Sequence, residues 1–355
     1  MVYLIDPGRW SGLASSYVGA VIDSASIDAE GYFVFEELPD TDEPIVLQLA
    51  VQRKGERFLN RLDNDDPATS NYFPIIWQTG QKLKLTAEVE QLQESLQLVD
   101  PDAQNAAVIR LRDIRSQAYQ EYLEVYYATT EVEEDLLELE DAVLRFQRTL
   151  MHFAEESPDL LPALMAIRWL NHSYDFERVA EFVVAQSERW QQEAPEHPWV
   201  VELSELTARE KMPVLIGDFM PNYPLPMLGG DTIPLRALLS EKLTLIDLWA
   251  SWCAPCRVQN RDYLVPLWDE YRTQGFGIIA YGLESSSAAW VPAIQADGAF
   301  RWQHASHLQG DDSPFFERLR ISTIPANFLL DADGRIVAKN LHSEELVEFV
   351  KTWLE

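Results

Sequence analysis

Residues 245–257 read LIDLWASWCAPCR and contain both cysteines of a chain of 355 residues. The apolar run LTLIDLW (243–249) predicts a buried strand, and a helical stretch begins near Ala254. A lone Cys-x-x-Cys pair can bind a metal, form a structural disulfide or exchange electrons reversibly. The surrounding sequence has to separate these three alternatives.

The available ligands disfavour a zinc site. Structural zinc usually takes two Cys-x-x-Cys pairs, or one pair with histidines at a set spacing. The chain has no second pair, and of its six histidines only His304 and His307 approach such a spacing. We expect both histidines to lie at the surface, and we expect no bound metal.

The position of the cysteine pair favours redox chemistry. It lies where a strand ends and a helix begins, and helix N-termini carry free N–H groups and a partial positive charge. Both features stabilise a thiolate, which is the reactive form of cysteine. We expect Cys253, at the helix start, to be exposed and to attack. We expect Cys256, one turn into the helix, to be buried and to resolve the mixed disulfide.

Strands and helices alternate after the pair. FGIIAYG (276–282) predicts another buried strand, and ANFLLDADGRIVAKNL (326–341) predicts a hairpin that turns at Asp333-Gly334. SEELVEFVKTWL predicts a final amphipathic helix capped by Ser343. Residues 212–231 are rich in proline and glycine and mark the entry to this part of the chain. We therefore predict an α/β domain over 212–355.

Three segments in sequence order carry a family resemblance. LIDLWASWCAPCR resembles the active-site segment of the thioredoxin superfamily. IGDFMPNYPLPMLGGDTIPLRALL (216–239) resembles the lead-in of its extracytoplasmic TlpA/ResA-like branch, and ISTIPANFLLDADGRIV (321–337) resembles a later segment of that branch. The resemblance implies a thioredoxin-like fold and disulfide exchange with protein clients. By pattern alone, the preceding half resembles the extension before such domains in some bacterial envelope proteins.

The resemblance implies a role for Asp247. This residue lies six positions before Cys253, where thioredoxins keep a buried acid. Burial in an apolar strand should raise its pKa, and its carboxylate would then accept the proton of Cys256. The alternative is a half-exposed strand residue. No cofactor is expected beyond the redox-active disulfide itself.

The resemblance also implies a substrate surface that faces the cysteines. A cis peptide bond between Ile324 and Pro325 would let the backbone of Ile324 pair with an extended client peptide. Trp249 is expected to pack in the core. The expected substrate-binding residues are Trp252, Ala254, Pro255, Thr323, Ile324 and Pro325.

Two positions depart from the family pattern. Relatives often carry a glutamate three residues after the second cysteine, where this chain has Gln259. A family role that needs a second ionisable group near the thiols is therefore in doubt. Arg261 stands where relatives often have a helix proline, and the nearest proline is Pro266. The helix kink should therefore be shifted or lost.

The N-terminal half shows two periodicities. Alternation in PIVLQLAVQ (44–52) and KLKLTAEV (82–89) predicts strands, as does DAEGYFVFEEL (28–38) after a turn at Gly31. Leu111, Ile114 and Ala118 instead step by three and four, which predicts amphipathic helices. We predict a multidomain α+β chain with an antiparallel β domain over 1–100, a helical region over 101–211 and a thioredoxin-like domain over 212–355.

The formal net charge is −30. An acidic surface repels phosphate backbones and argues against nucleic-acid binding. The first residues, MVYLIDPGRW, lack the features of a signal peptide. Because the resemblance is to an extracytoplasmic branch, we favour the cell envelope or periplasm over the cytoplasm, with the leader absent from this sequence.

Two functional classes remain open. The first is a reductase of disulfides in client proteins, which a membrane-linked thiol donor would recharge. The second is an envelope protein that binds a partner or glycan through its N-terminal half and uses the thiols to sense redox state. Peroxide reduction is disfavoured because the resolving cysteine lies so near the first. The N-terminal half is also a candidate for homodimerisation.

Overall fold

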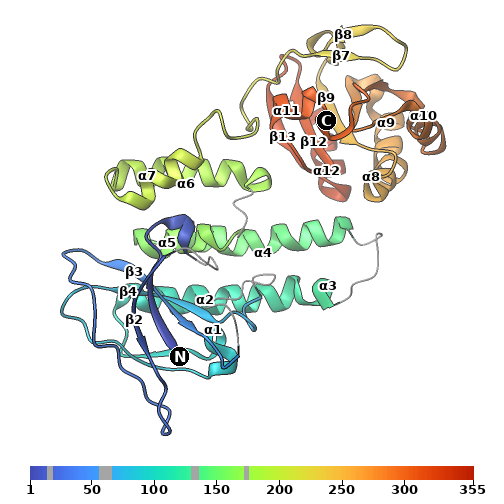
Figure 1. Cartoon of the computed structure of the whole chain (residues 1–355). Coiled ribbons are helices and arrows are strands. Elements are labelled where there is room, and N and C mark those ends of the chain that lie inside the picture. The colour runs from blue at the N-terminus through green and yellow to red at the C-terminus, as the bar shows by residue number, and fades with distance from the viewer. Residues whose placement is uncertain (14–18, 56–65, 129–135, 172–175) are drawn as a thin grey trace. The chain divides into compact units, whose positions relative to one another are not determined.

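The computed structural model describes residues 1–13, 19–55, 66–128, 136–171 and 176–355. The described residues cluster into two compact units (Figure 1). The first contains the residues up to 128 together with Glu138–Ala208, and the second contains Arg209–Glu355. Each unit has its own hydrophobic core. The division falls close to residue 212, where the sequence predicts entry into the α/β domain.

A four-stranded antiparallel sheet, in the order β2-β1-β3-β4, organises the first unit. Every residue of β4 is buried, as are all residues of β3 except its first. Alternation of apolar and polar residues predicts a strand, but it does not show whether other elements also cover the second face of that strand. The strand bounds are Val2–Asp6 (β1), Ala20–Ala25 (β2), Ile45–Val51 (β3) and Tyr72–Trp77 (β4).

Helices complete the core of the first unit, so strands and helices share one apolar cluster. Asp102 caps α2 by accepting hydrogen bonds from the N–H groups of Gln104 and Asn105. This is the role for which aspartate is favoured at helix N-termini. The helix bounds are Leu92–Ser95 (α1), Ala103–Tyr122 (α2), Glu124–Ala128 (α3), Leu136–Glu156 (α4), Leu160–Arg168 (α5), Ala180–Glu193 (α6) and Pro198–Leu206 (α7).

Two strand predictions in this unit need correction. Residues 32–38 form no strand, and Tyr32 and Val34 are largely exposed. Their alternation is real, but no strand among the described residues pairs with them. Within 82–89 only Lys84–Thr86 is a strand (β5), and it pairs with Gln97–Val99 (β6). A strand exists only where a partner supplies backbone hydrogen bonds, and periodicity does not reveal that partner.

The second unit contains a five-stranded mixed sheet in the order β11-β10-β9-β12-β13. Strand β9 lies in the middle, parallel to β10 and antiparallel to β12. The strands at 243–249 and 276–282 and the hairpin at 326–341 were all predicted. The bounds are Leu243–Trp249 (β9), Phe276–Gly282 (β10), Gln303–Ala305 (β11), Ala326–Asp331 (β12) and Ile336–Lys339 (β13). Pro224–Pro226 (β7) and Thr232–Pro234 (β8) form a separate hairpin.

The helix after the cysteines is irregular. Ala254–Gln259 (α8) continues into a π-helical turn at Asn260–Leu264 and then into Val265–Tyr271 (α9). Pro266 lies at the start of α9, so the irregularity precedes it, as expected for a shifted proline. The other helices of this unit are Ser287–Ala296 (α10), Pro314–Leu319 (α11) and Ser343–Leu354 (α12).

The predicted cap of α12 is wrong by one residue. His342 occupies the N-cap position, and Ser343 is already the first helical residue. Helix ends commonly shift by a residue or two relative to sequence patterns.

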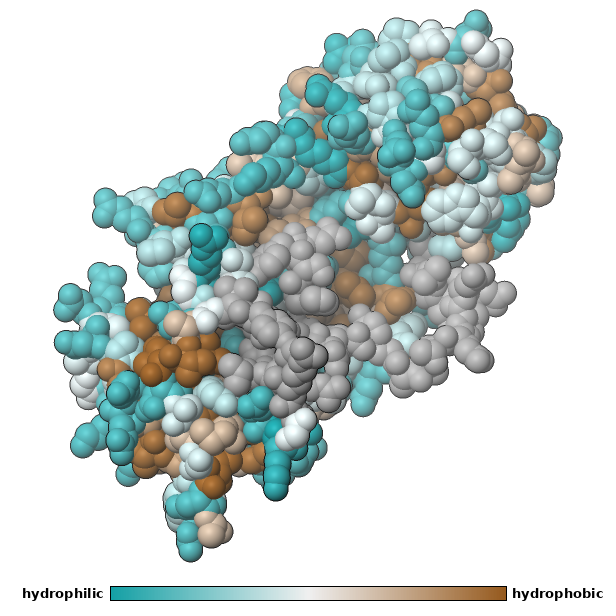
Figure 2. Space-filling model, in the orientation of Figure 1, coloured by the Kyte–Doolittle hydropathy of each residue, from teal (hydrophilic) through white to brown (hydrophobic). Residues whose placement is uncertain are grey.

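The surface carries local apolar areas. In the first unit the exposed apolar side chains include Val21, Val34 and Leu38, and apolar surface is visible over its strands (Figure 2). Among the described helices we find none with the length and apolar character needed to span a bilayer.

Candidate functional site

Cys253 and Cys256 form a disulfide at the start of α8, with their Cα atoms 5.3 Å apart. Cys253 is the N-cap residue, and its sulfur accepts the N–H of Cys256 at 3.3 Å. In the reduced protein the same N–H group would face a thiolate. A free N–H at a helix start stabilises negative charge on that sulfur.

The prediction that Cys253 is exposed is wrong for this oxidised state. Its exposed fraction is 5%, against 3% for Cys256. Both sulfurs belong to the apolar core of the second unit. Bonding to Cys256 holds the Cys253 side chain against the protein, which sequence position alone does not convey.

Asp247 lies at the fifth position of the fully buried strand β9 and is 3% exposed. Burial raises the pKa of Asp247 from its ordinary value of 3.8 to about 7. Within the described part of the chain, no group donates a hydrogen bond to its Oδ2. The carboxyl group can therefore gain or lose a proton near neutral pH, as a proton acceptor requires.

The peptide bond between Ile324 and Pro325 is cis. These residues directly precede β12, whose first residue, Ala326, lies opposite Leu248 near the end of β9. Because the two strands are antiparallel, the start of β12 and the end of β9 lie at the same edge of the sheet. The cis bond and the cysteine turn therefore share this edge.

The predicted substrate residues differ in exposure. Trp252 is 64% exposed, and Ala254 and Thr323 are also exposed. Ile324 is half-buried, whereas Pro255 and Pro325 are buried. Trp249, predicted to pack in the core, is fully buried. A client could therefore reach Trp252, Ala254 and Thr323, whereas the two prolines are shielded from solvent.

The expectation of a surface position is wrong for His304, which is only 4% exposed. Strand β11 pairs with β10 and carries this side chain among the rings of Trp249, Trp290 and Trp302. Burial lowers the pKa of His304 to about 4. The described residues contain no group of three or more His, Cys, Asp or Glu side chains arranged to hold a metal ion.

Sequence reasoning identified Gln259 only as a departure and missed its partner. Gln259 is buried, and its Oε1 lies 2.7 Å from Nδ1 of His342. The bond ties α8 to the start of α12. These residues are 83 positions apart, and no spacing rule connects them.

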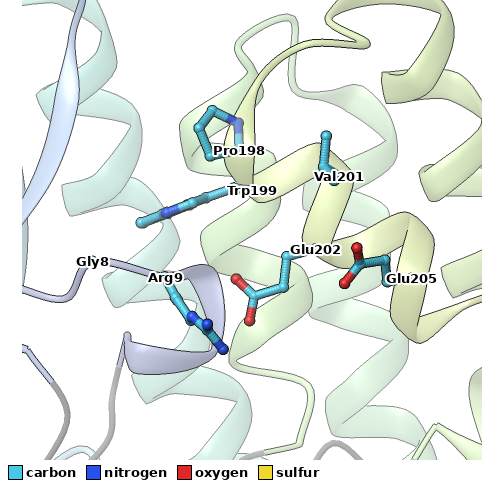
Figure 3. Close-up of a pocket in the computed structure, with 7 residues that line it drawn as sticks. All are labelled: Gly8, Arg9, Pro198, Trp199, Val201, Glu202 and Glu205. Carbon is cyan, nitrogen blue, oxygen red and sulfur yellow. The ribbon is translucent and has the colours of Figure 1, made fainter.

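The first unit has a surface cavity of about 330 Å³ that contains charged side chains and an indole. Figure 3 shows Arg9 beside the carboxylate-bearing face of α7. Glu202 is held in place because it accepts the N–H groups of Trp10 and Ser11 at 2.8 and 3.1 Å. The lining residues are Gly8, Arg9, Pro198, Trp199, Val201, Glu202 and Glu205.

Comparison with known proteins finds relatives of the second unit. No protein-family model matches the chain. Thiol:disulfide interchange protein DsbE of Pseudomonas fluorescens biotype C is 27% identical over 122 residues, which cover 34% of this chain and 64% of that protein. HelX of Rhodobacter capsulatus, also named a thiol:disulfide interchange protein, is 26% identical over 35% of this chain and 67% of its own length. The chain thus spans about two thirds of these relatives.

Solved structures give a similar result. A C-terminal domain from Bacteroides thetaiotaomicron, described as that of a thiol-disulfide oxidoreductase, is 30% identical. The match covers 39% of this chain and 96% of that domain, with a TM-score of 0.37. A thiol-disulfide oxidoreductase from Bacteroides fragilis is 28% identical over 38% of this chain and 98% of its own, with a TM-score of 0.36. On its motifs and the two interchange-protein relatives, the second unit belongs to the thioredoxin superfamily, as a TlpA/ResA-like member.

Proposed function

We propose that this chain is a thiol–disulfide oxidoreductase that reduces disulfides in client proteins through Cys253 and Cys256. The observation that carries the proposal is the bridge between these cysteines at the start of α8. A helix start activates the first thiol, and the second lies within bonding distance of it. The names of the relatives support the same reaction class.

The reaction would proceed by two exchanges. The Cys253 thiolate attacks one client sulfur, the client disulfide breaks, and its other sulfur leaves as a thiolate. Cys256 then attacks the sulfur of Cys253, releases the second client thiolate and closes the internal disulfide. The client gains two electrons from the protein dithiol. Asp247 accepts the proton that Cys256 loses, which its raised pKa permits.

We further propose an extracytoplasmic setting, in which a membrane-linked thiol donor restores the dithiol. The names of the interchange proteins support this setting, because client disulfides form and persist mainly in oxidising compartments. Fractionation of the native host tests the compartment. Homodimerisation through the N-terminal half stays a prediction that sedimentation analysis can test.

Insulin reduction driven by dithiothreitol tests the activity. Wild type should accelerate precipitation of the insulin B chain, and Cys253→Ser should not. Cys256→Ser should accumulate mixed disulfides with its clients. Because the chain has no third cysteine, every trapped client must be bonded to Cys253. Equal rates for wild type and Cys253→Ser would refute the proposal for this substrate.

The cavity of the first unit supports a second candidate function, the binding of a partner or glycan. An indole next to two carboxylates, one of them held by hydrogen bonds, and a guanidinium suits a polar ligand with an apolar face. Loss of binding in Trp199→Ala, with binding retained when both cysteines are replaced, would favour this function. Retained catalysis in the same Trp199 variant would show that the two functions are separable.

A further inference from the structure

The turn that presents Cys253 has Ser251 at one corner. The N–H of Cys253 donates to the carbonyl of Ala250 at 3.1 Å, which closes a tight turn between β9 and α8. Ser251 and Trp252 are its two central residues. Because Cys253 is the last residue of this turn, the conformation of the turn sets the position of its sulfur relative to the N–H of Cys256.

Side chains from two other places in the sequence hold every polar group of Ser251. The carboxylate of Glu284 accepts its N–H through Oε1 and its hydroxyl through Oε2, the latter at 3.0 Å. On the opposite side, Nη1 of Arg257 donates to the Ser251 carbonyl at 3.2 Å. We call this arrangement the Ser251 clamp; it consists of Glu284, Ser251 and Arg257.

The two residues of the Ser251 clamp that bind Ser251, Glu284 and Arg257, are each held in place by further contacts. Glu284 is 4% exposed, and its own carbonyl accepts the N–H of Gly310 at 2.9 Å. The preceding residue, Leu283, donates its N–H to Trp249 at 2.8 Å. Arg257 forms an ion pair with the buried carboxylate of Asp297. Because Glu284 and Arg257 are themselves held by other parts of the unit, their hydrogen bonds to Ser251 restrain the turn.

The charge of Glu284 and its hydrogen bonds to Ser251 are expected to shift the pKa of Cys253 in opposite directions. A carboxylate near a thiol disfavours the thiolate and raises the thiol pKa, so its charge alone would hinder activation. Holding the sulfur against the helix start would lower that pKa. We propose that Glu284 is a positioning residue for Cys253 and acts through its hydrogen bonds to Ser251. The inference rests on the proposed redox role of Cys253.

The test compares two variants that remove the same charge. Glu284→Gln keeps an oxygen that can accept the Ser251 N–H and an amide that can donate to its hydroxyl, whereas Glu284→Ala keeps neither. Both are made in the full-length Cys256→Ser background. The pH dependence of alkylation by iodoacetamide then reports the pKa of the single thiol. Glu241→Ala, which removes an exposed carboxylate of the same unit, is the control.

We expect the Cys253 pKa in Glu284→Ala to exceed that in Glu284→Gln by roughly one pH unit, a fraction of the range over which environment lowers thiol pKa values. Equal pKa values in the two variants would overturn the inference. If Glu284→Ala does not fold, as judged by circular dichroism, Glu284→Asp replaces it. That variant keeps the charge but shortens the reach, and a pKa equal to wild type would overturn the inference. Because alkylation needs no client, a wild type inactive on insulin would refute the proposed function without deciding this test.

Discussion

Replacing Asp247 with asparagine should stabilise the second unit above pH 7 and leave its stability almost unchanged near pH 4. The folded-state pKa of about 7 lies above the ordinary 3.8 because burial disfavours the charged carboxylate. Between these two values the folded protein binds more protons than the unfolded chain, so stability falls as pH rises. Above pH 7 the loss in the free energy of unfolding no longer changes with pH. At about 1.4 kcal/mol per pH unit, the difference between the two pKa values corresponds to a loss of about 4 kcal/mol.

Asparagine removes the ionisation and keeps the shape of the side chain. The free energy of unfolding of Asp247→Asn minus that of wild type should therefore grow from near zero at pH 4 to about 4 kcal/mol at pH 8, as an upper estimate. Hydrogen exchange measured on peptides from β9, β10 and β12 reports on the second unit alone. Wild type and variant are compared at the same pH, both oxidised. Asp262→Asn, an exposed carboxylate in the π-helical turn, controls for the loss of one charge.

If the difference in free energy of unfolding between Asp247→Asn and wild type does not change with pH, the assignment of a buried, titrating carboxyl group is refuted. The same variant should also slow turnover at pH 7 and above, because Cys256 loses its proton acceptor. A variant that is more stable and less active would show that the buried acid reduces stability for the sake of the reaction.

Three further outcomes follow from how deeply each side chain is buried. Lowering the pH from about 6.5 to 4 should reduce the free energy of unfolding by about 3 kcal/mol through His304, because the unfolded chain takes up a proton that the buried imidazole resists. The His304→Phe variant should lose this acid sensitivity in denaturant melts. Phe328→Ala, at a fully buried position in β12, should lower the free energy of unfolding by about 3–5 kcal/mol in the same melts. Trp252→Ala should change stability by less than about 0.5 kcal/mol but weaken client binding, measured as a higher KM for insulin.

Local pattern was sufficient to predict much of the second unit. The apolar run at 243–249 matches β9 residue for residue, and the hairpin turn at Asp333-Gly334 lies between β12 and β13. The spacing of the cysteines and the helix that follows them predicted a pair able to bridge. These features depend on neighbours within a few residues, which is the range that hydrophobic periodicity and turn chemistry report.

The tertiary structure decided the environment of the site. Glu284 contacts Ser251 across 33 positions, and His342 contacts Gln259 across 83. His304 is buried because β11 pairs with β10, whereas 32–38 has a strand pattern but forms no strand in the described structure. Periodicity indicates which face of an element is apolar but not what covers that face. The partners of a buried polar group come from distant parts of the chain, and only the packed fold brings them within hydrogen-bonding distance.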